Sequence, residues 1–181
     1  TSIISVGTGT IWIADKSATP LSATWVEAFK TLKDSLKIEQ ADGTAVEVYV
    51  DQSDLPVYSL TKAGKLTLTF QVPDTATAMW NMFFNTVAET ATVASPAVID
   101  GASYEAVGVK MDLKTIDKML RVEFAGGDQM WIFHNLNISR KIVAGTLSTT
   151  PITFEIKCEV TANPDSAKSD VIILNKINVG A

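Results

Sequence analysis

The sequence predicts a mainly β protein, an antiparallel β-sandwich or barrel with one or two short helices. The first observation is a strict alternation of apolar and polar residues over residues 45–51, 65–72 and 152–161. This period of two is typical of strands that face a core on one side only. The second is the frequency of threonine, which suits polar strand faces because it is β-branched. The third is that no linker, long charge run or repeat divides the 181 residues, so we expect a single domain over residues 1–181.

The clearest strand covers residues 65–72, where Leu66, Leu68, Phe70 and Val72 point one way. Residues 152–161 repeat the pattern, with Cys158 on the apolar face, and residues 45–51 place three valines on one face. We expect all three strands to be half-buried on a core. Further strands are expected at residues 11–13, 36–40, 103–111, 118–125, 130–140 and 171–174.

Glycine-containing turns separate several of these strands. Residues 126–128 (Gly-Gly-Asp) predict a hairpin between strands 118–125 and 130–140. Residues 41–43 (Ala-Asp-Gly) predict another between strands 36–40 and 46–50. A polar stretch containing Pro56 interrupts the alternation, so we expect a loop or arm excursion around residues 51–63.

Two segments break the period of two and predict helices. The first follows Asp74, a suitable N-cap, and has an apolar stripe at spacings of four, three and four. The stripe consists of Ala76, Trp80, Phe83 and Val87. This helix is expected to cover an open end or face of the sheets. The second helix is expected within residues 22–33, where Trp25, Phe29 and Leu32 share a helical face.

Charge and composition restrict the function. Lysine and arginine number 15 against 20 acidic residues, a net charge of −5, and only Arg121 and Arg140 are arginines. Duplex-DNA binders neutralise phosphates with basic residues, so this balance argues against that class. Charged residues are 19% of the chain, below the usual proportion of about 25%, which predicts surface buried against other subunits. No apolar run reaches the roughly 18 residues of a membrane span, and no secretory signal is recognisable at residue 1.

No catalytic, cofactor-binding or metal-binding site is predicted, and we do not expect an enzyme. His134, the single histidine, sits in an apolar alternation typical of a core or interface position. Cys158, the single cysteine, is expected to be buried and inert, so the chain cannot form an internal disulfide. One cysteine and one histidine cannot supply the four ligands of a structural zinc site. The acids at 51 and 54 suit a solvated turn better than a cation site.

Two other classes remain open. Tryptophans 12, 25, 80 and 131 could form a platform for sugar rings, which would make the protein a carbohydrate- or cell-surface-binding β-sandwich module. A β-sandwich hydrolase would instead require two carboxylates to converge in a cleft, and sequence alone does not show such pairs.

Residues 47–57 (EVYVDQSDLPV) carry the most distinctive pattern, followed by the strand GKLTLTF at residues 64–70 and then by the expected helix. Together with residues 9–14, 19–21 and Trp25, this order resembles the tail tube proteins, or major tail proteins, of long-tailed bacteriophages. The resemblance covers roughly residues 9–90.

The resemblance implies a β-sandwich subunit that forms rings, expected to be hexameric, which stack into a hollow tube. DNA would pass through this tube during ejection without sequence-specific binding. The implied partners are further copies of the chain, a tape measure protein and a tail terminator. The implied location is the virion tail, after synthesis in the cytoplasm of the bacterial host, and no cofactor is implied.

Interface and lumen residues are expected from the same reasoning. Apolar residues in an excursion usually bury somewhere, so we expect Val57, Tyr58 and Leu60 to contact a neighbouring subunit. Trp80 and Phe83 are expected to be buried in the subunit core or between subunits. The net charge predicts that the bore of the tube is acidic to neutral. A negative wall repels the DNA phosphates, so the DNA is not held there. The lumen candidates are Thr67, Thr69, Gln71 and Glu123.

Overall fold

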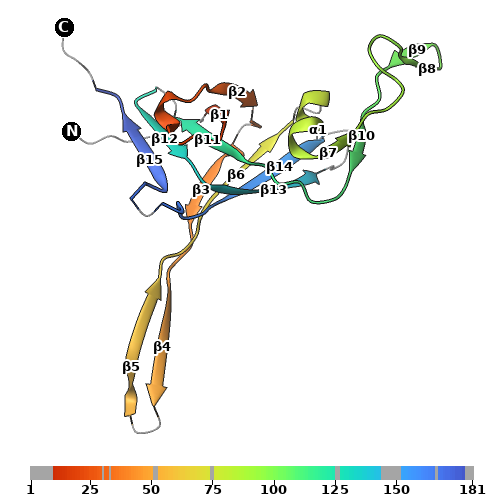
Figure 1. Ribbon diagram of the computed structural model, residues 1–181. Coiled ribbons are helices and arrows are strands. Elements are labelled where there is room, and N and C mark those ends of the chain that lie inside the picture. Colours follow the sequence, from red (N-terminus) through yellow and green to blue (C-terminus); the bar gives the residue numbers. More distant parts are fainter. Residues whose placement is uncertain are drawn as a thin grey trace.

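The computed structural model describes residues 10–29, 31–32, 34–50, 53–73, 76–124, 127–143, 152–165 and 167–177. Antiparallel strands make up most of this part of the chain, which confirms the predicted mainly β class. Two sheets pack against each other, and two hairpins project from them (Figure 1).

The larger sheet has five strands in the order β15-β12-β11-β1-β2. They are β15 (Val171–Asn175), β12 (Gln129–Phe133), β11 (Lys118–Glu123), β1 (Thr10–Asp15) and β2 (Val26–Phe29). The hairpin predicted between β11 and β12 is confirmed by their pairing and by Gly127, whose φ of +67° suits glycine.

The smaller sheet has four strands in the order β13-β14-β6-β3. They are β13 (Leu136–Val143), β14 (Thr153–Val160), β6 (Leu66–Val72) and β3 (Lys37–Gln40). The alternation predicted for β6 and β14 is confirmed, since Leu68, Phe70, Ile156 and Cys158 are almost fully buried. The other face of this sheet remains polar.

The core lies between the two sheets. Ile11 and Val122 from the larger sheet meet Phe70 and Phe154 from the smaller one in one buried cluster. The strand predicted over residues 130–140 does not exist as one unit, because it is interrupted at His134 and Asn135. There the chain leaves β12 in one sheet and enters β13 in the other, so a single apolar run serves both layers.

Helix α1 (Thr77–Phe83) lies against this core through Met79 and Phe83. It is shorter than predicted: its N-cap position is Ala76, and Asp74 lies outside the described residues. The expected continuation to Val87 is wrong, because residues 85–87 form β7 (Asn85–Val87), which pairs with β10 (Gly108–Lys110). The helix ends where the Lys114 ammonium donates to the carbonyl oxygens of Asn81 and Phe84.

The second predicted helix, over residues 22–33, is wrong. A short 3₁₀ turn, η1 (Pro20–Ser22), precedes β2, which pairs with β1 as the edge strand of the larger sheet. Val26 pairs with Ile13 there, so sheet pairing overrides the helical spacing of the aromatic residues.

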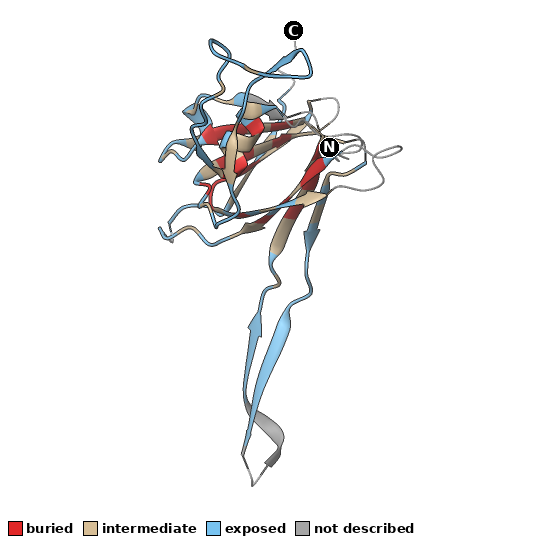
Figure 2. Ribbon diagram, turned by 90° about the vertical axis from the view of Figure 1, so that its right-hand side faces the viewer, coloured by how far each residue is buried: buried red, intermediate tan, exposed pale blue. Residues whose placement is uncertain are grey.

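The smaller sheet continues outward as a long hairpin of β4 (Thr44–Val50) and β5 (Ser53–Lys62). The turn predicted at residues 41–43 is wrong, since β3 pairs with β6 and β4 pairs with β5. The expectation that residues 45–51 lie on a core is also wrong, because the described side chains of β4 are exposed (Figure 2). We call β4 and β5 together the arm.

A second, smaller hairpin consists of β8 (Ala97–Ile99) and β9 (Ala102–Tyr104), joined by Asp100 and Gly101 at positive φ. The strand predicted over residues 103–111 is therefore divided between β9 and β10. Across the described residues, no helix has the length and apolar character needed to span a bilayer.

Candidate functional site: the arm and the polar sheet face

The arm is an amphipathic ribbon. Val46 pairs with Leu60 and Val48 with Tyr58, so these four side chains share one face. Their exposed fractions are 51%, 43%, 47% and 58%, respectively, which is high for apolar residues aligned on one surface. We call this set the apolar face of the arm. No described residue of the same chain covers it.

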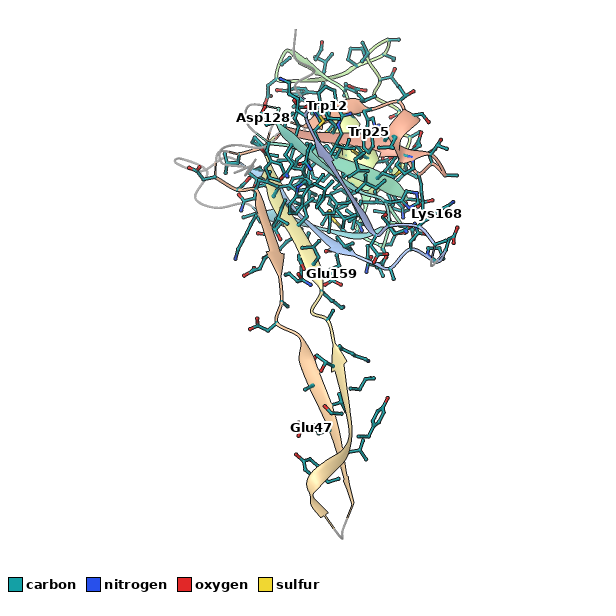
Figure 3. The ribbon with its side chains drawn as sticks, turned by 90° about the vertical axis from the view of Figure 1, so that its left-hand side faces the viewer. Trp12, Trp25, Glu47, Asp128, Glu159 and Lys168 are labelled. Atoms are coloured by element: carbon teal, nitrogen blue, oxygen red, sulfur yellow. The ribbon has the colours of Figure 1, made fainter. Side chains whose placement is uncertain are left out.

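The opposite face of the arm is polar. Glu47 pairs with Ser59 and Ala45 with Thr61. The Tyr49 hydroxyl donates to the Glu47 carboxylate at 2.5 Å, and this hydrogen bond is the main reason why the pKa of Tyr49 is raised. Glu47 lies far out along the arm (Figure 3). The two faces therefore differ in chemistry, although both are exposed in a single chain.

The outward surface of the smaller sheet forms the second candidate surface, which we call the polar face. Thr67, Thr69 and Gln71 of β6 lie on it beside Glu159, Lys157 and Glu155 of β14. β3 and β13 add further polar residues at both edges: Lys37, Glu39, Asn137, Ser139 and Lys141.

Charges on the polar face are nearly balanced and largely paired. Lys65 lies 3.2 Å and Lys157 3.5 Å from the Glu159 carboxylate, and Lys37 lies 2.8 Å from Glu39. The hydrogen bond and the charge of Lys65 lower the pKa of Glu159. A face of this kind offers few unpaired cations to a passing polyanion.

The structure separates the predicted lumen candidates into two groups. Thr67, Thr69 and Gln71 lie together on the polar face. Glu123 does not join them, because it lies on β11 of the larger sheet, on the face directed away from the core. The sequence prediction overlooked Lys157 and Glu159, although the alternation over residues 152–161 already placed them on a polar side.

The predicted interface residues also fall into two groups. Tyr58 and Leu60 are exposed on the arm, and Val57 belongs to β5, although its side chain lies outside the described part. Trp80 is half-buried, with its ring 4.8 Å from that of Phe154. Phe83 is 1% exposed and packs in the chain's own core, so it leaves no surface for a neighbouring subunit.

The single histidine and the single cysteine are both buried in the described part of the chain. His134 is buried and its Nε2 lies 2.7 Å from the Ser17 carbonyl oxygen, whereas the Cys158 thiol is buried between the sheets. Among the described residues, no three His, Cys, Asp or Glu side chains are close enough to hold a metal ion. A groove of about 380 Å³ runs between α1 and residues 114–118. Two lysines line this groove. Lys114 donates to the carbonyl oxygens of Asn81 and Phe84, and Lys118 donates to the Asp15 carboxylate.

The four tryptophans do not form one platform. Trp12 and Trp25 lie near each other on the outer side of the larger sheet (Figure 3). Trp131 pairs with Val122 on the inner side of that sheet, and Trp80 lies on α1.

No family model matches the chain, and no curated protein matches it.

Proposed function

We propose that this protein is a structural subunit of the hollow tail tube of a long-tailed bacteriophage. In this proposal copies of the chain form rings, expected to be hexameric, and the rings stack into a tube that conducts DNA during ejection. The observation that carries the proposal is the apolar face of the arm, which nothing in the described chain covers.

An uncovered apolar ribbon needs a partner. A two-stranded hairpin is marginally stable in water unless it packs against something. Fully burying a valine or leucine side chain contributes about 1.5–3 kcal/mol, so covering the exposed halves of Val46, Val48 and Leu60 favours association. Exposed apolar surface of this kind typically marks a protein–protein contact. The resemblance of residues 9–90 to tail tube proteins makes a neighbouring copy the favoured partner.

The polar face suits the wall of a DNA conduit. Nucleic acids are held by cations that neutralise phosphates, and retention increases with the number of such contacts. Lys65 and Lys157 pair with Glu159 there, while the short neutral side chains of Thr67 and Thr69 occupy the middle of the sheet. We therefore propose that β6 contributes to the lumen.

The remaining parts of the proposal follow from the same assembly. The protein acts without a cofactor and without catalysis. Its partners are further copies, a tape measure protein and a tail terminator, and DNA passes without sequence-specific binding. Its location is the virion tail, after synthesis in the bacterial cytoplasm.

The test is electron microscopy in negative stain together with sedimentation velocity. The wild-type protein is expected to form rings or tubes as its concentration rises. A variant with Val48→Ser and Leu60→Ser on the apolar face is expected to stay folded by circular dichroism and remain monomeric. The control, Ala45→Ser with Thr61→Ser, alters the opposite side of the same two strands nearer the body and is expected to assemble.

Three results would count against the proposal. Featureless monomers at every concentration would remove its basis. Saturable binding of a glycan by such a monomer would support the alternative, a carbohydrate- or cell-surface-binding module. Assembly of the Val48/Leu60 variant at the wild-type concentration would show that the arm is not the contact.

A further inference from the structure

Arg121 has an unusual environment on the outer side of the larger sheet. Its guanidinium carbon lies 4.8 Å from the centre of the Trp12 ring and 5.1 Å from that of Trp25. Trp12 is its cross-strand partner on β1, whereas Trp25 comes from the segment leading into β2. Two indoles from different segments thus contact one cation.

The guanidinium lacks the partners that such a group normally has. Among the described residues, it forms no hydrogen bond or ion pair, although Glu123, two residues further along the same face, attracts it electrostatically. Its Nε is buried without an acceptor, and so is the Trp12 Nε1. The side chain as a whole is half-buried. The two terminal nitrogens of the guanidinium are therefore the atoms that can bind a partner. Their N–H groups form a planar fork that matches the two oxygens of a carboxylate.

The surroundings resemble the centre of a protein–protein contact. Leu21, four residues before Trp25 in the chain, is 65% exposed. Tryptophan and arginine are the residue types enriched at such centres. This surface is on the opposite side of the sandwich from the polar face, and it does not include the arm.

We propose that Arg121, with Trp12 and Trp25, receives a carboxylate side chain from a second copy of this chain. Charge complementarity favours this occupant, because the chain carries 20 acidic residues and a net charge of −5. A second copy therefore offers a surplus of carboxylates to a guanidinium that forms no hydrogen bond or ion pair with the described residues of its own chain. The proposal rests on the self-assembly proposed above and adds a contact that is independent of the arm.

The chain allows a direct measurement, since it contains only two arginines, Arg121 and Arg140. Their side-chain Nε–H signals give two resonances in a ¹⁵N NMR spectrum, and Arg121→Lys assigns them by removing one. As protein concentration rises, the Arg121 signal is expected to shift or broaden. Arg140 already donates to the Asp112 carbonyl oxygen at 2.7 Å within its own chain, so it provides the internal reference.

Sedimentation velocity then measures the effect on association. Arg121→Met is expected to weaken self-association about tenfold or more, as for the loss of a charge-assisted hydrogen bond. Lys176→Met removes the same charge from an exposed position beside β15 and is expected to leave association unchanged. Sodium acetate is expected to dissociate the wild-type protein more than sodium chloride at equal ionic strength, because acetate competes for the guanidinium.

The outcomes separate this inference from the proposed function. Association of Arg121→Met as strong as that of wild type, with an Arg121 signal independent of concentration, would overturn the inference and leave the tube intact. Dimers that depend on Arg121 but never form rings or tubes would support the inference and contradict the tube. A wild-type protein that stays monomeric would overturn both.

Discussion

Gly64 lies directly against Ala41 where the arm leaves the body. A Cβ atom at position 64 would stand 1.7 Å from the Ala41 carbonyl oxygen, and one at Gly43 would stand 2.8 Å from that of Lys62. The two strands approach closely enough here for the Ala41 N–H to donate to Lys65 O at 3.0 Å. Glycine is required because only the absence of a side chain permits this approach.

Gly64→Ala is therefore expected to force the two strands apart at the base of the arm. The cost should be about 1–3 kcal/mol of unfolding free energy, the usual range for overpacking. Urea titration followed by circular dichroism measures it. Ala63→Ser, at the neighbouring exposed position, is the control and should change stability by less than about 0.5 kcal/mol. An equally small effect for Gly64→Ala would show that the strands are farther apart than described.

Trp80→Ala should destabilise the fold by removing the contacts of the indole with Phe154 and Phe84. Full burial would predict about 3–5 kcal/mol. Since Trp80 is half-buried, we expect about 2–3 kcal/mol in a urea titration. Val98→Ala, on the exposed β8–β9 hairpin, should change stability by less than about 0.5 kcal/mol. A loss below about 1 kcal/mol for Trp80→Ala would indicate an indole that contributes little to the core.

Cys158 is expected to resist thiol reagents while the protein is folded. Burial raises the pKa of this thiol to about 12, so almost no thiolate exists at pH 8. Modification by a coloured disulfide reagent should be slow in buffer and become fast in the urea range where the protein unfolds. Because the folded protein disfavours the thiolate, the contribution of Cys158 to the free energy of unfolding is complete below the ordinary thiol pKa of about 8.5. It decreases as pH rises above that value. Rapid labelling of the native protein would contradict the burial.

Lys65→Met should raise the pKa of Glu159, because Lys65 supplies the main hydrogen bond and charge that lower it. A carboxyl with a lowered pKa stabilises the fold above its ordinary pKa, and that contribution is lost as pH falls through the folded value. An NMR titration of the Glu159 carboxyl carbon measures the shift directly. Lys141→Met removes a charge from the same face, opposite Glu155, and should affect Glu159 much less.

The sequence predicted the strands of the sandwich correctly where the apolar face of an alternating segment is buried in the core, as in β6 and β14. It failed for β4, although Val46 and Val48 alternate just as Leu68 and Phe70 do. Alternation shows that a strand has one apolar face, but not what covers that face. The answer depends on strand pairing, and the pairing of β3 with β6 sends β4 and β5 beyond the core.

The candidate surfaces were predictable in part for the same reason. Thr67, Thr69 and Gln71 share a face because they share a strand, which a local pattern reveals. Their neighbours Lys157 and Glu159 come from a strand about 90 positions later, and register brings them together. Arg121 and Trp25 meet because the chain passes from a 3₁₀ turn into strand β2, whereas the sequence predicted a helix there.

The alternation of side chains along the arm limits how its length can change without loss of its apolar face. β4 has seven residues, and a strand rises about 3.3 Å per residue, so the ribbon extends about 23 Å. Inserting one residue into each strand near the base would turn Val48 and Tyr58 to the other side. Inserting two would keep them on the same face and move them, together with the tip, outward by about 7 Å. Homologous arms that keep the same contact should therefore differ by even numbers of residues per strand, and the distance between connected bodies should vary in steps of that size.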